Sequence, residues 1–163
     1  MRRLLVFAAA LAIVLGADAA LAQRQTSDDR HEGYYYPKVA SRETWPSRAQ
    51  TLPGSDRRRR IAFATGIAKQ MSELPYAAPY SFFVKGDEGE KLIIVANGEG
   101  SLNTPYRARA LLATLTAHAR LTPIFAEFAV EDLFTFLDLC KMLGIRQVTV
   151  SDGRAFAHQI RIR

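Results

Sequence analysis

Two pairs of short apolar segments, each joined by a tight-turn sequence, constrain the fold of this chain most strongly. The first pair, residues 80–85 and 92–96, flanks a Gly-Asp-Glu-Gly turn. The second pair, residues 146–150 and 156–162, flanks a Ser-Asp-Gly-Arg turn that contains the Asp-Gly signal of a hairpin. Apolar runs of this length with turn residues between them are typical of β-hairpins. The sequence therefore predicts two hairpins.

Three segments with helical patterning lie before and between these hairpins. Apolar residues recur at helical spacing over residues 55–74, 104–119 and 131–143. Thr104 caps the second of these helices, and Pro105 occupies its first position. A helix followed by two strands thus occurs twice. No crossover connection is required, so we predict an α+β two-layer sandwich, in which an antiparallel four-stranded sheet carries three helices on one face.

The first 22 residues have the order of a secretory signal peptide. Arg2 and Arg3 precede an apolar run over residues 4–15, and an Ala-Leu-Ala box ends directly before Gln23. The run is shorter than the roughly 20 residues that span a bilayer. We therefore expect cleavage before Gln23 and a periplasmic protein; the alternative is a retained membrane anchor.

The mature chain has two parts by composition. Residues 23–54 combine polar, basic and aromatic residues with repeated prolines, so an extended or partly disordered segment is predicted. Residues 55–163 carry the helical and strand patterns and are predicted to form a single α+β domain.

Cysteine and histidine are sparse. The single cysteine, Cys140, excludes an internal disulfide, and it lies within the apolar run 133–143. A buried structural thiol is the favoured interpretation, and a reactive nucleophile is the alternative. His31, His118 and His158 have no metal-ligand spacing, so neither a metal site nor a cofactor is predicted.

The positive charge of the chain is local. The net charge is +6, and the stretch from Lys38 to Arg60 alone carries +5. Four consecutive arginines begin the first helix, where the helix dipole disfavours cations. Binding to a partner would explain why the chain keeps this unfavourable placement of arginines. The alternative is that the arginines are only the solvated start of the helix. We expect contact with a protein complex or an anionic membrane surface, and not with nucleic acid, through Tyr34, Tyr35, Tyr36, Arg42, Trp45, Arg57, Arg58, Arg59 and Arg60.

A second candidate site lies at the start of the helix over residues 104–119. Backbone N–H groups at a helix N-terminus with arginines beside them can hold a carboxylate or a phosphate. The candidate residues are Ser101, Asn103, Arg107 and Arg109. Surface arginines lying over tyrosines are the alternative interpretation.

Several segments of the chain resemble a group of small exported bacterial proteins that are commonly labelled molybdopterin-guanine dinucleotide biosynthesis protein A. The enzyme of that name begins with a glycine-rich nucleotide-binding loop, which this sequence lacks, so the resemblance transfers no catalytic residue. The segments are Tyr35-Tyr36-Pro37-Lys38-Val39, Ser41-Arg42-Glu43, Lys91-Leu92-Ile93-Ile94-Val95, Tyr106-Arg107-Ala108-Arg109-Ala110, Phe134-Thr135-Phe136-Leu137-Asp138 and Thr149-Val150-Ser151-Asp152-Gly153.

The sequence leaves two functions open. We favour a non-enzymatic periplasmic accessory protein that binds a protein complex or a membrane surface through its basic aromatic N-terminal segment. The alternative is an enzyme or cofactor-handling protein, molybdopterin-related by the resemblance, with an anion site near Arg107 and Arg109. An enzyme requires a concave site with converging polar groups, whereas an accessory protein requires only an exposed apolar or basic face.

Overall fold

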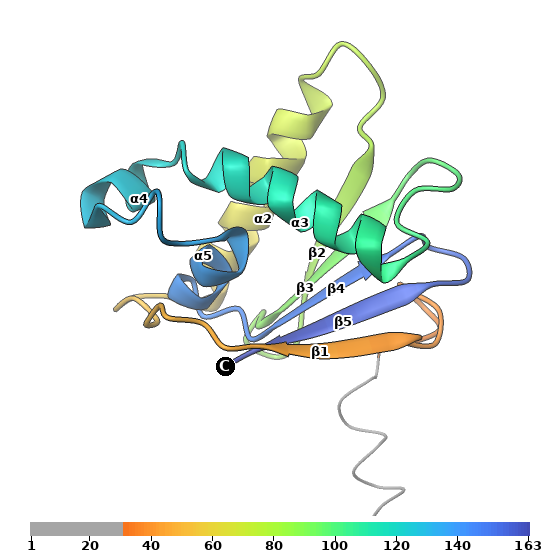
Figure 1. Cartoon of the computed structure of the whole chain (residues 1–163), viewed down its shortest axis with the longest axis horizontal. Helices are drawn as coiled ribbons and strands as arrows, with labels where there is room; N and C mark the ends of the chain where they lie inside the picture. Colours follow the sequence, from red (N-terminus) through yellow and green to blue (C-terminus); the bar gives the residue numbers. More distant parts are fainter. Residues whose placement is uncertain (1–30) are drawn as a thin grey trace, which may run out of the picture. The chain divides into compact units, whose positions relative to one another are not determined.

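A five-stranded mixed sheet with the strand order β1-β5-β4-β3-β2 organises the fold (Figure 1). The β2–β3 and β4–β5 pairs are antiparallel hairpins, whereas the β3–β4 and β1–β5 pairs are parallel. This computed structural model describes residues 31–163, so the expected signal peptide and its cleavage site lie outside the described residues. The strands are β1 (Ser41–Trp45), β2 (Tyr80–Lys85), β3 (Lys91–Ala96), β4 (Gln147–Ser151) and β5 (Ala157–Ile162).

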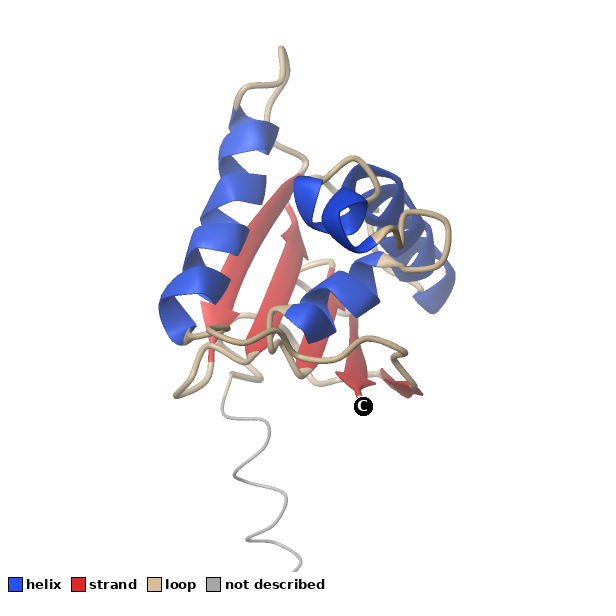
Figure 2. Cartoon of the chain, turned by 90° about the vertical axis from the view of Figure 1, so that its left-hand side faces the viewer, coloured by secondary structure: helices blue, strands red, loops and turns tan. Residues whose placement is uncertain are grey.

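Of the four helices among residues 31–163, α2, α3 and α5 pack against one face of this sheet, and α4 packs on α5 and the end of α3 (Figure 2). Apolar residues of α2, α3 and α5 form one cluster with alternate residues of the strands, including Leu92, Ile94, Val148, Val150 and Ile160. The opposite face is covered in part by the chain before β1, where Tyr36 and Val39 pack on Ile93 and Ala157. The helices are α2 (Arg57–Ser72), α3 (Pro105–Ala119), α4 (Pro123–Phe128) and α5 (Phe136–Met142).

The predicted antiparallel four-stranded sheet with three helices is wrong. Both hairpins form, but β3 and β4 join them in parallel, and β1 adds a fifth strand parallel to β5. Parallel neighbours need a long crossover, and the connection containing α3, α4 and α5 supplies it between β3 and β4. This arrangement buries Leu92 and Ile94 beside Val148 and Val150 in the middle of the sheet.

The helix count differs from the prediction for local reasons. The Thr122-Pro123 pair forms the N-cap and first turn of an additional helix, α4, that was not predicted. The last helix begins at Phe136 rather than Glu131, because Thr135 and Asp138 form a capping box. The start of α5 is therefore set by a capping box, whereas α4 begins with Pro123 in its first turn and has no side-chain cap hydrogen bond from Thr122.

Candidate functional site

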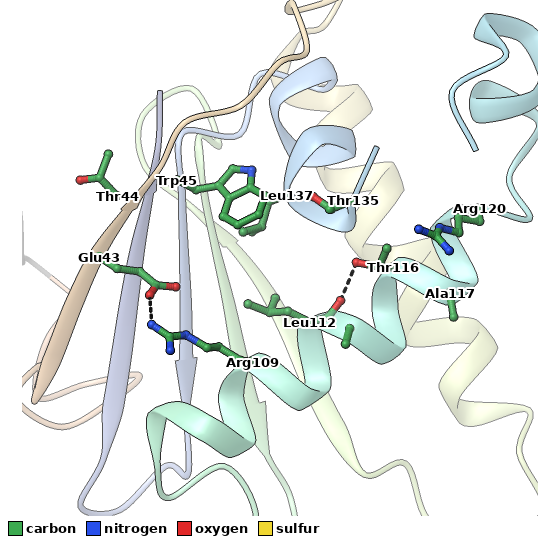
Figure 3. A pocket seen from close by; sticks show the side chains of 11 residues that line it. Glu43, Thr44, Trp45, Arg109, Leu112, Thr116, Ala117, Arg120, Thr135 and Leu137 are labelled. Carbon is green, nitrogen blue, oxygen red and sulfur yellow. Dashed lines mark hydrogen bonds and ion pairs between the residues drawn. The ribbon is translucent and has the colours of Figure 1, made fainter. Parts of the chain in front are cut away.

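A cavity of about 620 Å³ lies between β1 and α3, at the edge of the sheet (Figure 3). Side chains of Glu43 and Trp45 point into it from β1, while α3 and the start of α5 form the other side. We call this cavity the β1–α3 groove. Its lining residues are Glu43, Thr44, Trp45, Arg109, Leu112, Ala113, Thr116, Ala117, Arg120, Thr135 and Leu137.

One end of the groove carries a cluster of three charged or titratable side chains. Arg109 Nη2 lies 2.5 Å from Glu43 Oε2, and His158 Nε2 lies 3.2 Å from Glu43 Oε1. Partial burial alone would raise the pKa of the Glu43 carboxyl, but hydrogen bonding and charge from Arg109 and His158 outweigh it and hold the pKa below its ordinary value. His158 is 1% exposed. Glu43 is therefore an ionised carboxylate between an arginine and a buried imidazole.

The other end of the groove offers an unpaired cation. The Arg120 guanidinium, at the far end of α3 in Figure 3, has no ion pair or hydrogen bond with any described residue. The indole nitrogen of Trp45 also has no hydrogen-bond partner in the described part of the chain, but it is buried, so a ligand in the groove does not reach it. A groove with an apolar floor and one unmatched cation is suited to an amphipathic ligand with an acidic group.

Asp138 fixes the position of β1 relative to α5. Its Oδ1 accepts hydrogen bonds from the Ser47 hydroxyl at 2.7 Å and from the Arg48 backbone N–H at 3.3 Å. Its Oδ2 accepts from the Thr135 backbone N–H at 2.9 Å. Burial alone would raise the pKa of this carboxyl, but these hydrogen bonds lower it. The two walls of the groove are thus joined through one carboxylate.

The structure does not gather the predicted aromatic residues on one surface. Tyr34 is 82% exposed, whereas Tyr36 is buried. The ring of Tyr35 packs on Phe83, with centroids 5.4 Å apart, on the sheet face opposite the helices. Trp45 points into the groove on the helix-covered face. Trp45 therefore has a different environment from the three tyrosines.

The arginines of the predicted binding surface also lie on different parts of the molecule. Arg42 points to the sheet face opposite the groove, where its Nε donates to Gln159. Arg57, Arg58 and Arg59 are exposed in the first turn of α2. These three form the exposed part of the predicted basic cluster.

Arg60, the fourth arginine of the run, is a buried structural residue. Its guanidinium donates to the backbone carbonyls of Leu143 and Ser55, each at 2.8 Å, and to that of Glu88. It thereby satisfies carbonyls at the end of α5, in the β2–β3 turn and before α2. Because it is buried, Arg60 is not available to an external partner.

Three of the four predicted anion-binding residues divide between two cavities. Ser101 and Arg107 line a separate cavity of about 510 Å³, where the Arg107 guanidinium donates to the Gly100 carbonyl. Arg109 faces the β1–α3 groove. Residues two positions apart on a helix point about 200° apart, which explains the division. Asn103 is exposed and lines neither cavity.

Sequence reasoning missed the groove because its residues come from distant segments. Glu43, Arg120 and Leu137 were not among the predicted site residues, and His158, considered only for metal-ligand spacing, is buried beside Glu43. One signal was available: Glu43 and Trp45 are two residues apart, so in a strand they share a face.

Comparison with protein-family models, with curated proteins and with solved structures finds no match to this chain. Among residues 31–163, no helix has the length and apolar character needed to cross a membrane. In the same part of the chain, no group of three or more histidine, cysteine or acidic side chains is arranged to hold a metal ion. The site must therefore be interpreted from its own geometry.

Proposed function

We propose that this protein is a non-enzymatic accessory protein of the periplasm that binds a partner protein in the β1–α3 groove. The observation that carries the proposal is the cavity of about 620 Å³ with Trp45, Leu112 and Leu137 on its surface and arginines at both ends. Tryptophan and arginine are enriched among residues that dominate protein interfaces. A mostly apolar concavity with few polar groups is the usual form of a binding site.

The state of the polar groups favours binding over catalysis. Glu43 is already neutralised by Arg109, and its lowered pKa makes it a poor proton donor near neutral pH. His158 lies beneath it and is 1% exposed, so the imidazole is out of reach of a substrate. The cluster therefore supports a role in shaping and charging the groove.

The remaining parts of the proposal concern the cellular location of the protein and its electrostatic encounter with the partner. The signal-peptide order of the first 22 residues supports export to the periplasm. Exposed Arg57, Arg58 and Arg59 would attract an acidic partner or an anionic membrane surface and accelerate the encounter. The groove would then provide the specific contact.

The test uses Trp45, the one tryptophan in the sequence, as a probe of the groove. Random 12-residue peptides displayed on phage are selected on the purified protein, and a selected synthetic peptide is titrated while Trp45 fluorescence is recorded. We expect a saturable change. Ala113→Phe, which fills the groove, should weaken binding at least about tenfold, a loss of roughly 1.4 kcal/mol. The matched control is Ala62→Phe, an equal change at an exposed position of α2 outside the groove lining.

Two results would contradict the proposal. One is a selection that enriches no peptide. The other is a selected peptide whose affinity is the same for the wild-type protein and for Ala113→Phe.

A further inference from the structure

β1 is an edge strand whose outer side can accept another strand. It pairs with β5 on one side, and no strand lies on its other side in the described part of the chain. The Arg163 N–H donates to the Trp45 carbonyl, and the Ser47 N–H donates to the Arg163 carbonyl. In this register the backbone groups of Trp45 and Glu43 point to β5, so those of Thr44 point outward.

The edge of β1 and the groove are neighbours. Side chains alternate between the two faces of a sheet, and Glu43 and Trp45 direct theirs into the groove. A strand added beyond β1 would place every second side chain on the same face. Those side chains would lie beside Trp45 and Leu137 and opposite α3. An extended polypeptide can therefore use the backbone edge and the cavity at once.

The charges of the groove specify what such a segment should carry. Arg109 is paired with Glu43 at 2.5 Å, whereas Arg120 has no partner among the described residues. The two arginines lie about 16 Å apart along the α3 axis, a length that about five extended residues cover. β1 itself has five residues. The unmatched cation calls for an acidic side chain in the bound segment.

We propose that the ligand of the groove is an extended segment of the partner protein that adds to β1 as a sixth strand. The segment inserts alternate apolar side chains beside Trp45 and pairs a carboxylate with Arg120. This inference rests on the proposed function and specifies the mode of binding. Strand addition of this kind draws affinity from backbone hydrogen bonds and specificity from the side-chain pocket.

A second copy of the chain fits the same edge less well. Antiparallel pairing of two β1 strands about Glu43 would place two carboxylates directly opposite each other, which is destabilising. Pro46, directly after β1, also has no N–H to donate, so it limits how far the pairing can extend. A short segment can end before Pro46 and place its acidic group at Arg120, away from Glu43.

The decisive variant is Thr44→Pro, compared with Thr44→Val. Proline at this position removes the outward N–H and leaves the β5-facing groups of Glu43 and Trp45 in place. Valine keeps the N–H and the strand propensity. We expect Thr44→Pro to weaken binding of the selected peptide at least about tenfold, and Thr44→Val to change it less than about twofold.

A second measurement leaves the protein unchanged. The peptide is synthesised with one backbone N-methyl group at each position in turn. An added strand presents alternate N–H groups to β1, so N-methylation should abolish binding at every second position of about five residues. Arg120→Gln should weaken binding and remove its dependence on the acidic residue of the peptide, whereas the control Arg146→Gln, at an exposed position outside the groove lining, should not.

The outcomes separate the two proposals. If Ala113→Phe abolishes binding but Thr44→Pro and all N-methylated peptides bind normally, the groove is the site and strand addition is wrong. If Ala113→Phe has no effect, the proposed function itself fails. If Arg120→Gln leaves the preference for an acidic residue unchanged, the charge pairing is wrong.

Discussion

The Ser47 hydroxyl donates a 2.7 Å hydrogen bond to Asp138 Oδ1, and this contact joins the chain that leaves β1 to the first turn of α5. The two residues are 91 positions apart in the sequence. Asp138 also completes the capping box of α5 with Thr135. One buried carboxylate thus both starts a helix and holds the edge strand against it.

Asp138→Ala should therefore destabilise the fold and open the groove. Loss of a helix cap costs about 0.5–2 kcal/mol, and the Ser47 and Arg48 donors lose their acceptor as well. Ser47→Ala should cost less, about 1 kcal/mol. Urea unfolding followed by circular dichroism measures both. Asp132→Ala, at an exposed position before α5, is the control, and equal stability of Asp138→Ala and Asp132→Ala would contradict the assignment.

Acid should destabilise the protein through three carboxyls. The pKa values of Glu43, Asp138 and Asp152 lie below their ordinary values, because hydrogen bonds outweigh the effect of burial, which alone would raise them. Such groups contribute stability that is fully present above their unfolded pKa, about 4, and is lost as the pH falls through the folded pKa. We expect the free energy of unfolding to be level near neutrality and to fall below about pH 4. Urea unfolding at a series of pH values measures it.

The Asp138→Asn variant tests the origin of that slope. It removes one of the three titrating carboxyls, so its stability should fall less steeply with acid than that of the wild type. If the free energy of unfolding falls equally steeply with acid in the two proteins, Asp138 does not contribute to the acid destabilisation.

Arg60 should be the member of the arginine run whose loss destabilises the protein most. Its guanidinium satisfies three backbone carbonyls in a buried position, so Arg60→Gln should cost about 3 kcal/mol or more. Arg57→Gln and Arg58→Gln should leave the melting temperature unchanged within error, because both side chains are exposed. Thermal unfolding distinguishes them, and equal melting temperatures for all three variants would contradict the structural role.

Cys140 should be unreactive in the folded protein. The thiol is fully buried, and burial raises its pKa far above the ordinary value, with the charge of Asp138 adding to the effect. Reaction with a chromogenic disulfide reagent should be slow in buffer and fast after unfolding in guanidinium. Rapid reaction of the native protein would instead indicate an exposed nucleophile.

The sequence predicted features that depend on neighbouring residues. Both hairpins form, because their turns and strands lie within a few residues of each other. The β1–β5 pairing was not predictable in the same way, since Ser41 and His158 meet only through the whole intervening chain. The three prolines near Trp45 made this stretch look irregular, and a five-residue strand fits between two of them.

The candidate site could be predicted only in part, for geometric reasons. Arg109 and Trp45 were both named, but for separate sites, and the fold brings them to one groove. Arg107 lies two residues before Arg109 in α3. The helical rotation between the two positions directs the Arg107 side chain toward the other cavity. Arg60 is identical in type to its three neighbours, and only tertiary packing makes it a buried residue.

The position of β5 between β1 and β4 determines when the groove can exist. β1 and its pairing partner β5 lie more than one hundred residues apart in the chain, as the contact between Arg42 and Gln159 illustrates. Such long-range pairings form late and slow folding. A nascent or truncated chain that stops before residue 157 would have Trp45 and the helices but no strand to hold β1 beside α3. Under the proposed function, a chain that lacks β5 would therefore be unable to present the groove to its partner.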